Sequence, residues 1–523
     1  MSSELPPASY GDYQNEIYLA GLEGVLPQFP VDYRTLEARA AGALPASVLS
    51  YVQSGCGDET TQIRNVEAFG HWGMTPRMMV DSSKRDLSIE LFGLKLPSPL
   101  FMAPIGITGL CTQDSHGDLA AARASILTRV PMMATTLSND PLETVAATLG
   151  DMPGFFQLYT PKDKAFAESL IQRAEAAGFK GIVVSLDAWD TGWRPRDLAS
   201  ANFPQLRGHV LANYTSDPVF QTMLGKAAVT DRKAVVQLWY SRFGKVLTWA
   251  DMPWLRSITK LPLILKGICH PDDAIYCSNH GGRQANGGRA AIDMLPAVVA
   301  ASGDTPVLFD SGVRSGTDVV KALAMGARAV GVGRPYVYGL ALGGDVGAAH
   351  VLKCLLAEAD LLMAVNGYPT ISDVRAADVT RLWGRRGHVL PVMVSTYSLV
   401  GIIISTAGSS LNLRLGIYPE MERPAILNRS MPSTAGTTMS NPAFQGRPSS
   451  AFQRFVTLST RNAIYIFRET GHDHDGHERL RGSPSVQRKA FGRPKSRSSE
   501  ANHARMLLPG LCPSPSFIVE FFI

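Results

Sequence analysis

Eight short apolar segments, seven of which end at a glycine or at a polar or charged residue, recur between residues 100 and 334 of this 523-residue chain. Near-continuous apolar runs of this length are typical of strands in a parallel sheet that is buried on both faces. Helical patterns such as Phe166–Ala177 and Thr317–Met325 lie between several of them. Repeated strand–helix units with eight strands predict a (β/α)8 TIM barrel, with a doubly wound sheet as the alternative. The predicted strands are Leu100–Ile107, Pro131–Thr136, Gly154–Tyr159, Gly181–Asp187, Leu261–Gly267, Ala274–His280, Thr305–Gly312 and Ala329–Arg334.

Polar and titratable residues gather at the C-terminal ends of these predicted strands. In a barrel, these ends converge on one mouth, where active sites are built. In the interior of a strand each polar group would be buried at a large cost in free energy, so the pattern favours the barrel over the doubly wound sheet. The residues concerned are Gln157, Tyr159, Ser185, Asp187, Lys266, Ser278, His280, Asp310 and Arg334.

The composition changes after Trp383. Residues 384–523 contain 17 Lys and Arg against 8 Asp and Glu, whereas residues 1–383 contain 33 against 37. The basic excess therefore lies in the tail, and nucleic acid is not an expected partner of the domain. We expect an N-terminal extension at 1–30, a barrel domain at 31–383 that is preceded by an N-terminal helical segment, and a basic tail of low order at 384–523, rich in Ser, Pro, Arg and Gly.

Three further features concern the cell compartment. The segment 389–408 is uncharged and about as long as a membrane span, but its Pro, two Gly and five Ser or Thr make a membrane helix unlikely. The six cysteines show no CxxC pair and no metal-ligand spacing, which indicates reduced intracellular thiols and no metal site. The N-terminus has neither a basic nor an apolar signal region. We therefore expect a cytoplasmic protein.

The connection between the fifth and sixth predicted strands is too short for an ordinary barrel unit. Only six residues, ICHPDD, separate Gly267 from Ala274, whereas a parallel crossover normally needs a dozen or more, usually forming a helix. If both strands have ordinary length, the link must carry the chain from the end of the fifth strand back to the start of the sixth, a distance of about 17–20 Å. Six extended residues reach roughly 20 Å. The sequence thus predicts a taut link and one missing crossover helix.

The motif Ser278-Asn279-His280-Gly281-Gly282-Arg283-Gln284 is the strongest local signal for chemistry. A histidine at a strand end, followed by glycines and an arginine, suits a base beside a cation that holds an anion. Asp187 also ends a strand and could orient the histidine, while Arg194 could clamp a carboxylate. Taken alone, Asp187 could equally cap a helix and Arg194 could form a surface ion pair.

The last two strands are followed by Asp310-Ser311-Gly312-Val313-Arg314 and Gly331-Val332-Gly333-Arg334. Glycines at these two positions of a barrel let backbone N–H groups approach a phosphate, which the arginines can neutralise. Lys266, at the end of LILKG, could form a Schiff base or lie beside an electron-rich cofactor ring, and its spacing does not decide between them.

Several motifs together resemble the FMN-dependent family that oxidises L-2-hydroxy acids, which includes glycolate oxidase and lactate oxidase. They are YVQSGCGDE, MAPIG, FFQLY, SNHGGRQ, DSGVRSGTDVVKALAMGA and VGVGRP, and the resemblance covers about residues 15–383. The stretches LDAWDTGWRPRDL, NFPQLRG and NYTSDPVF most resemble the lactate 2-monooxygenase branch. The tail shares none of these motifs.

The resemblance implies roles for individual residues. His280 matches the catalytic base, Asp187 its carboxylate partner, and Tyr159 the tyrosine whose hydroxyl contacts the substrate oxygen. Tyr51, Arg194 and Arg283 match the groups that bind the substrate carboxylate. The FMN ring contacts correspond to Pro104, Ile105, Gly106, Thr135, Gln157, Ser185, Lys266 and Ser278, and the phosphate end to Asp310, Gly312, Arg314, Gly333 and Arg334.

We therefore expect FMN-dependent oxidation of a small, lactate-like L-2-hydroxy acid by O2, with oxidative decarboxylation as in lactate 2-monooxygenase. One alternative is a simple oxidase or dehydrogenase that releases the 2-oxo acid. Another is a degenerate, non-catalytic barrel that acts as a binding protein, which the missing helix motivates. The resemblance also implies a homotetramer. We interpret the missing helix and the tail as products of wrong exon boundaries rather than as functional innovations.

Overall fold

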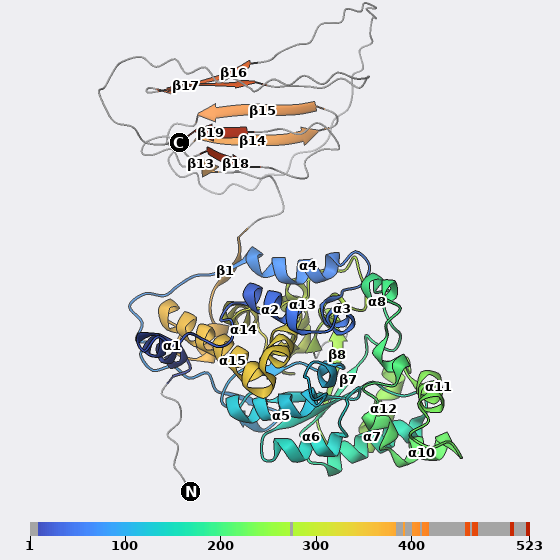
Figure 1. Ribbon diagram of the computed structural model, residues 1–523. Helices are drawn as coiled ribbons and strands as arrows, with labels where there is room; N and C mark the ends of the chain where they lie inside the picture. Colours follow the sequence, from blue (N-terminus) through green and yellow to red (C-terminus); the bar gives the residue numbers. More distant parts are fainter. Residues whose placement is uncertain are drawn as a thin grey trace, which may run out of the picture. The chain divides into compact units, whose positions relative to one another are not determined.

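The computed structural model describes residues 9–271 and 276–382 and, beyond them, only strand segments. The chain divides into two compact units, Met1–Pro419 and Glu420–Ile523. The first unit contains a closed barrel of eight parallel strands in the order β10-β11-β4-β5-β6-β7-β8-β9 (Figure 1). Closure confirms the predicted TIM barrel and excludes the doubly wound sheet. The strands are β4 (Leu100–Met102), β5 (Met132–Thr135), β6 (Gly154–Leu158), β7 (Ile182–Ser185), β8 (Leu263–Ile268), β9 (Tyr276–Cys277), β10 (Leu308–Phe309) and β11 (Ala329–Val332).

Amphipathic helices cover the outside of the barrel, and every residue of β4, β5, β6 and β7 is buried beneath them. Both helices predicted from the sequence are present, as α7 and α14. Ser315 begins α14 with a capping box, since its hydroxyl accepts from the backbone N–H of Asp318 and the Asp318 carboxylate accepts from that of Ser315. The barrel helices are α5 (Gly117–Thr128), α6 (Leu142–Leu149), α7 (Lys164–Ala176), α13 (Ala291–Ser302), α14 (Gly316–Ala324) and α15 (Arg334–Asn366).

A helical segment precedes the barrel, as expected. It comprises α1 (Asp12–Leu22), α2 (Tyr33–Ala43), α3 (Ala46–Gln53) and α4 (Thr60–Glu67). A small antiparallel pair, β1 (Trp72–Met74) with β12 (Val379–Arg381), and the hairpin β2 (Ile89–Leu91) with β3 (Leu94–Leu96) lie outside the barrel. The short helix α16 (Ile371–Arg375) follows α15.

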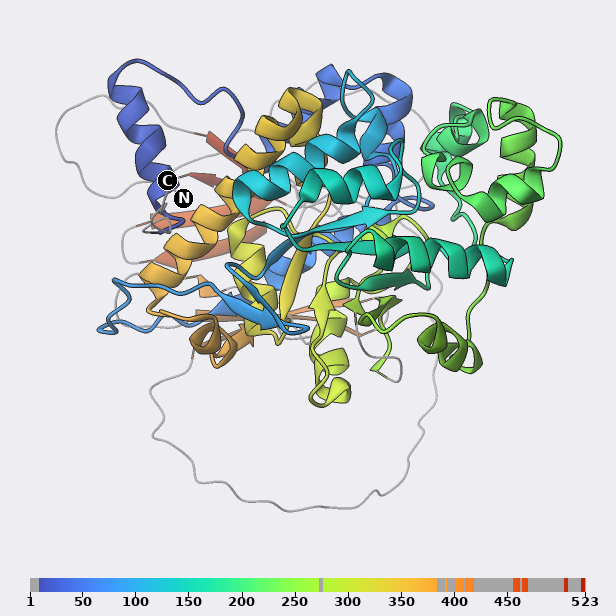
Figure 2. The same ribbon diagram turned by 90° about the horizontal axis from the view of Figure 1, so that it is seen from below.

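The longest insertion lies between β7 and β8. It contains α8 (Pro195–Ala199), the 3-10 turn η3 (Pro204–Arg207), α9 (Ala212–Thr215), α10 (Pro218–Leu224), α11 (Arg232–Arg242) and α12 (Met252–Ile258). The green elements α8 to α11 lie together at one side of the barrel in both views (Figures 1 and 2). The insertion is the loop that follows β7, so it begins at the C-terminal end of that strand.

The connection from β8 to β9 differs from its expected geometry. Tyr276 pairs with Lys266 and Cys277 with Ile268, so β9 begins beside the fourth residue of β8. The chain therefore returns only about two residues, or roughly 7 Å, rather than a full strand length. The prediction of a taut link across 17–20 Å is wrong because β9 is shortened to two residues. Residues 269–271 form no α-helix, which agrees with a missing crossover helix, and residues 272–275 lie outside the described chain.

Beyond residue 382 the structure describes only strands. In the first unit β13 (Pro391–Val392) and β15 (Ser410–Ile417) both pair antiparallel with β14 (Val400–Ala407). In the second unit β16 (Phe455–Thr460) pairs with β17 (Ala463–Arg468), and β18 (His503–Met506) with β19 (Val519–Phe522). The apolar stretch 389–408 thus contains β13 and β14, and its remaining residues lie outside the described chain. No described helix has the length and apolar character needed to cross a membrane. The boundaries at residues 30 and 383, and the low order of the tail, stay predictions.

Candidate active site

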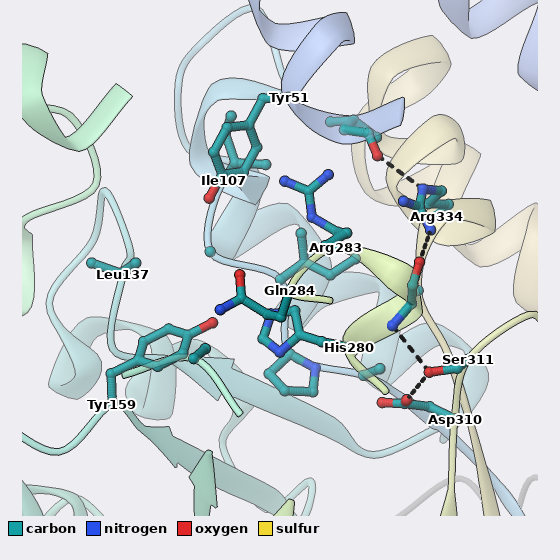
Figure 3. Close-up of a pocket in the computed structure, with 18 of the residues that line it drawn as sticks. Tyr51, Ile107, Leu137, Tyr159, His280, Arg283, Gln284, Asp310, Ser311 and Arg334 are labelled. Atoms are coloured by element: carbon teal, nitrogen blue, oxygen red, sulfur yellow. Dashed lines mark hydrogen bonds between the residues drawn. The ribbon is translucent and has the colours of Figure 1, made fainter. Parts of the chain in front are cut away.

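One cavity lies at the mouth of the barrel, where the C-terminal ends of the strands converge (Figure 3). Residues from widely separated parts of the chain line it, including Tyr51, Tyr159, Arg194, His280 and Arg283. The sequence predicted that all five would meet at this place, and the structure brings them together.

His280 and Asp187 form the pair expected from the sequence. The imidazole Nδ1 of His280 lies 3.0 Å from Oδ1 of Asp187. Burial lowers the pKa of His280, and the neighbouring Asp187 carboxylate only partly opposes this effect. Burial would raise the pKa of Asp187, but the charges of His280 and Lys266 outweigh it and lower that pKa. A neutral imidazole held by an ionised carboxylate is suited to accept a proton.

The backbone around His280 is held by side chains of its own turn, of the loop after β10 and of helix α4. His280 adopts a left-handed conformation with φ +56° inside the turn that follows β9. Its N–H donates to the hydroxyl of Ser278 at 3.1 Å, and the N–H of Gly281 donates to the hydroxyl of Ser311 at 3.0 Å. Asn279 exchanges side-chain hydrogen bonds with Asn65 of α4. These contacts fix the base although its own strand has only two residues.

Two arginines and a tyrosine form an anion site opposite this pair. The guanidinium of Arg283 lies 4.7 Å from the ring centroid of Tyr51, and that of Arg194 lies 5.6 Å from it. Burial, together with the nearby Arg194, lowers the pKa of Arg283 to about 9. Nη2 of Arg283 has no hydrogen-bond partner among the described residues. Two close cations with a free N–H favour a bound carboxylate.

The hydroxyl of Tyr51 is positioned by Gln205, a residue that the sequence reasoning did not assign to the site. Nε2 of Gln205 donates to the hydroxyl oxygen of Tyr51 at 3.4 Å, and both side chains are buried. Burial would raise the pKa of Tyr51, but Arg194 and Arg283 outweigh it and lower that pKa. Gln205 lies within the NFPQLRG stretch, which the sequence analysis singled out as a motif. The motif did not indicate that Gln205 contacts the hydroxyl of Tyr51.

Five of the residues predicted for the flavin ring form two hydrogen-bonded polar groups at the strand ends. Thr135 donates to Oε1 of Gln157 at 2.9 Å, and Nε2 of Gln157 donates to Ser185 at 3.0 Å. Lys266 donates to Ser278 at 2.8 Å. Burial opposes the charge of Lys266, but Asp310 and Asp187 outweigh it and raise the pKa of the lysine. Pro104, Ile105 and Gly106 line the same cavity from the loop after β4.

The predicted phosphate end is only partly as expected. Arg314 lines the cavity, and its Nε has no hydrogen-bond partner among the described residues. By contrast, the guanidinium of Arg334 already makes hydrogen bonds within the protein, because it donates to the backbone carbonyls of Val52 and Ser54 at 2.9 and 3.2 Å. Asp310 lies beside Lys266, with Oδ2 3.5 Å from Nζ. Thus Nε of Arg314 is without a partner among the described residues, whereas Arg334 is hydrogen-bonded to the end of α3, and the phosphate role of both stays a prediction.

Two glycines of this end have different surroundings. Gly312 has φ +95°, and a Cβ there would meet the carbonyl oxygen of Asn65 at 2.0 Å, so packing alone requires glycine. At Gly333 a Cβ would meet only Ile105 Cδ1, at 3.5 Å. The neighbouring residues therefore leave open space beside Gly333. The polar groups for a flavin ring, a free Arg314 N–H and this space together fit FMN.

Further residues of the cavity were not predicted. Gln284 accepts a hydrogen bond from Arg194, and its Nε2 donates to the backbone carbonyl of Asp187 at 3.0 Å. The hydroxyl of Ser311 donates to Asp310 at 2.9 Å and accepts from the N–H of Gly281 at 3.0 Å, so it links the loops after β9 and β10. Phe203, Trp239 and Phe243 come from the insertion between β7 and β8. Among the described residues no group of three or more His, Cys, Asp or Glu side chains could hold a metal ion.

Comparison with known proteins identifies the same family as the site does. The model of the FMN-dependent dehydrogenase family matches residues 40–381. An FMN-dependent alpha-hydroxy acid dehydrogenase, qulF of Penicillium citrinum, is 38% identical over 385 residues, which cover 71% of this chain and 95% of that protein. An L-lactate oxidase of Lysinibacillus sphaericus is 37% identical over 365 residues, covering 68% and 93%.

Solved structures agree. The lactate oxidase of Pediococcus acidilactici is 35% identical with a TM-score of 0.61, and the match covers 68% of this chain and 95% of that chain. A mandelate oxidase variant whose structure contains an FMN adduct is 32% identical with a TM-score of 0.58, covering 66% and 98%. The chain belongs to the FMN-dependent dehydrogenase family and is an FMN-dependent 2-hydroxy-acid oxidoreductase.

Proposed function

We propose that the protein oxidises a small L-2-hydroxy acid with O2 as the final electron acceptor. The observation that carries the proposal is that one cavity is lined both by His280, which contacts Asp187, and by the Arg194–Arg283–Tyr51 anion site. A base and a carboxylate clamp are what the oxidation of a 2-hydroxy acid requires.

The clamp orients the substrate. A carboxylate accepts hydrogen bonds from the free N–H of Arg283 and from the hydroxyl of Tyr51, whose oxygen already accepts from Gln205. The phenol proton of Tyr51 is therefore directed towards the substrate. Binding an anion between the two buried cations also relieves their mutual repulsion, which contributes to affinity.

The base removes a proton. Because Nδ1 of His280 faces Asp187, Nε2 is the nitrogen available to the substrate hydroxyl or Cα proton. Tyr159, assigned by the resemblance to the substrate oxygen, lines the same cavity, and burial raises its pKa so that it stays protonated as a donor. When bound, FMN accepts the two electrons released by the substrate.

Two product outcomes follow from this proposal. In the first, the 2-oxo acid and H2O2 react before release and give a carboxylate one carbon shorter, CO2 and water. The sequence stretches that resemble lactate 2-monooxygenase favour this outcome. In the second, the 2-oxo acid and H2O2 are released, and the relatives named L-lactate oxidase favour it. The non-catalytic barrel has no support from either the site or the family.

Product analysis tests the proposal. Purified holoenzyme is mixed with L-lactate in an oxygen electrode, with and without catalase, and the products are separated by chromatography. Acetate and CO2 without free H2O2 indicate the first outcome, and pyruvate with one H2O2 per O2 indicates the second. No O2 uptake and no bleaching of the flavin with any of a series of L-2-hydroxy acids would refute the proposal.

The predicted homotetramer and the cytoplasmic location also remain proposals. Light scattering behind size-exclusion chromatography measures the first, and localisation of a tagged chain measures the second.

A further inference from the structure

Five aromatic rings form a continuous arc along one wall of the cavity. The ring centroids of Tyr51 and Phe203 lie 6.4 Å apart, and those of Phe203 and Trp239 also 6.4 Å. The arc continues from Trp239 to Phe243 at 5.1 Å and from Phe243 to Tyr159 at 5.6 Å. All five side chains line the cavity. These separations are typical of packed aromatic pairs.

The middle of the arc comes from the insertion between β7 and β8. Phe203 precedes η3, Trp239 lies on α11, and Phe243 follows the end of α11. Trp239 is almost wholly buried, whereas Phe203 and Phe243 are half-buried. The half-buried rings therefore turn part of their apolar surface towards the cavity.

The two ends of the arc define how a substrate would lie along it. This step rests on the proposed function, in which Tyr51 binds the carboxylate and Tyr159 contacts the oxygen on Cα. The remaining substituent of Cα then extends into the space enclosed by Phe203, Trp239 and Phe243. Leu137 and Ala188 add apolar surface to the same cavity.

We infer that this arc is the binding site for the substrate side chain and that it selects L-2-hydroxy acids whose Cα carries an aromatic or branched aliphatic group. A methyl group, as in lactate, covers little of the exposed ring surface. Each further CH2 that is buried strengthens binding about fourfold. An aromatic group also gains from edge-to-face contact with the rings.

A substrate series tests the inference on the wild-type holoenzyme. Flavin reduction by glycolate, L-lactate, L-2-hydroxybutanoate, L-2-hydroxy-4-methylpentanoate and L-3-phenyllactate is followed without O2, which separates it from the product outcome. We expect the second-order rate constant of flavin reduction for the two largest acids to exceed that for L-lactate by about tenfold or more. If all acids reduce the flavin and L-lactate equals or exceeds the larger ones, the inference is wrong and the proposed function stands. If none does, both fail.

Single substitutions test whether the substrate preference depends on the aromatic arc. Trp239→Leu is expected to reduce the preference for L-3-phenyllactate over L-lactate about tenfold while flavin reduction by L-lactate continues. Tyr240→Leu is the matched control, because Tyr240 is the next residue of α11 and is 69% exposed. It should leave the preference unchanged. Should Trp239→Leu lose FMN, Phe243→Leu replaces it. An unchanged preference in the variant that retains FMN, or an equal change in the control, would overturn the inference.

Discussion

Nδ1 of His280 and Oδ1 of Asp187 lie 3.0 Å apart, although the two residues are 93 positions apart in the chain. Asp187 follows β7, and His280 follows β9, so each is carried to the barrel mouth by its own strand. The contact fixes which imidazole nitrogen faces the substrate. It also places a charge beside a buried histidine, and both effects can be measured.

His280→Gln should retain FMN but reduce the substrate-dependent rate of flavin reduction by several orders of magnitude, because it removes the proton acceptor and leaves the binding groups in place. Stopped-flow absorbance measures this rate. His280→Asn is a useful companion, since asparagine tolerates the left-handed backbone at this position. Near wild-type reduction by either variant would refute His280 as the base.

Asp187→Asn should lower kcat by about 10²–10⁴-fold, because the imidazole loses the carboxylate that holds its tautomer. It should also shift the acidic limb of the kcat/KM profile to lower pH. The carboxylate raises the pKa of His280 against the effect of burial, so its removal lets that pKa fall further. In the wild type this limb is expected below pH 6.5. A limb that stays in place or moves to higher pH would contradict the pairing.

Arg283→Lys should raise KM far more than it lowers kcat, because a lysine cannot reproduce the planar fork of N–H donors. The effect is expected to be about tenfold to a hundredfold in kcat/KM. Steady-state kinetics with one substrate measures it. Arg196→Lys provides a control, since Arg196 is an exposed arginine paired with Glu59 and does not line the cavity.

Asp118 should make stability depend on pH in the opposite sense to most carboxylates. Burial raises its pKa to about 6, while Thr108 and the backbone of Asn139 donate hydrogen bonds to it. The folded state therefore holds the proton more tightly than the unfolded state. Its contribution is fully present below about pH 4 and is lost as the pH rises through about 6.

Asp118→Asn removes this titration. The free energy of unfolding of the variant, relative to that of the wild type, should rise by roughly 2–3 kcal/mol between pH 4 and pH 7. Urea unfolding at a series of pH values measures the difference. Parallel curves for the two proteins would show that Asp118 does not titrate in this range.

Inserting a helix of about ten residues after Ala274 should raise the thermal midpoint, the soluble yield and the FMN content. Among the described residues, the pairing of β8 with β9 begins at Lys266, and Leu263–Leu265 pair only with β7. A helix would cover this part of the wall, and each large apolar side chain removed from water contributes about 1.5–3 kcal/mol. Equal behaviour of the two proteins would mean that the barrel tolerates the short connection.

Much of the barrel and of the polar site could be predicted because both follow from the strand pattern. A polar residue that ends a buried strand has to lie at the mouth, so the approach of Asp187 to His280 needed only the topology. The length of β9 could not be predicted, since register depends on pairing with β8 and β10. The engagement of Arg334 with α3 and the order of rings from Phe203 to Phe243 depend on helix packing that no periodicity encodes.

The turn that carries His280 is supported from its neighbours, through Ser278, Ser311 and Asn65, more than from its own two-residue strand. The position of the His280 imidazole is therefore set mainly by contacts on either side of its turn. The segment 269–275 is therefore a natural place for engineering. Loops of varied length could be grafted there, as recognition elements or as tethers, without redesigning the chemistry that lies a few residues away.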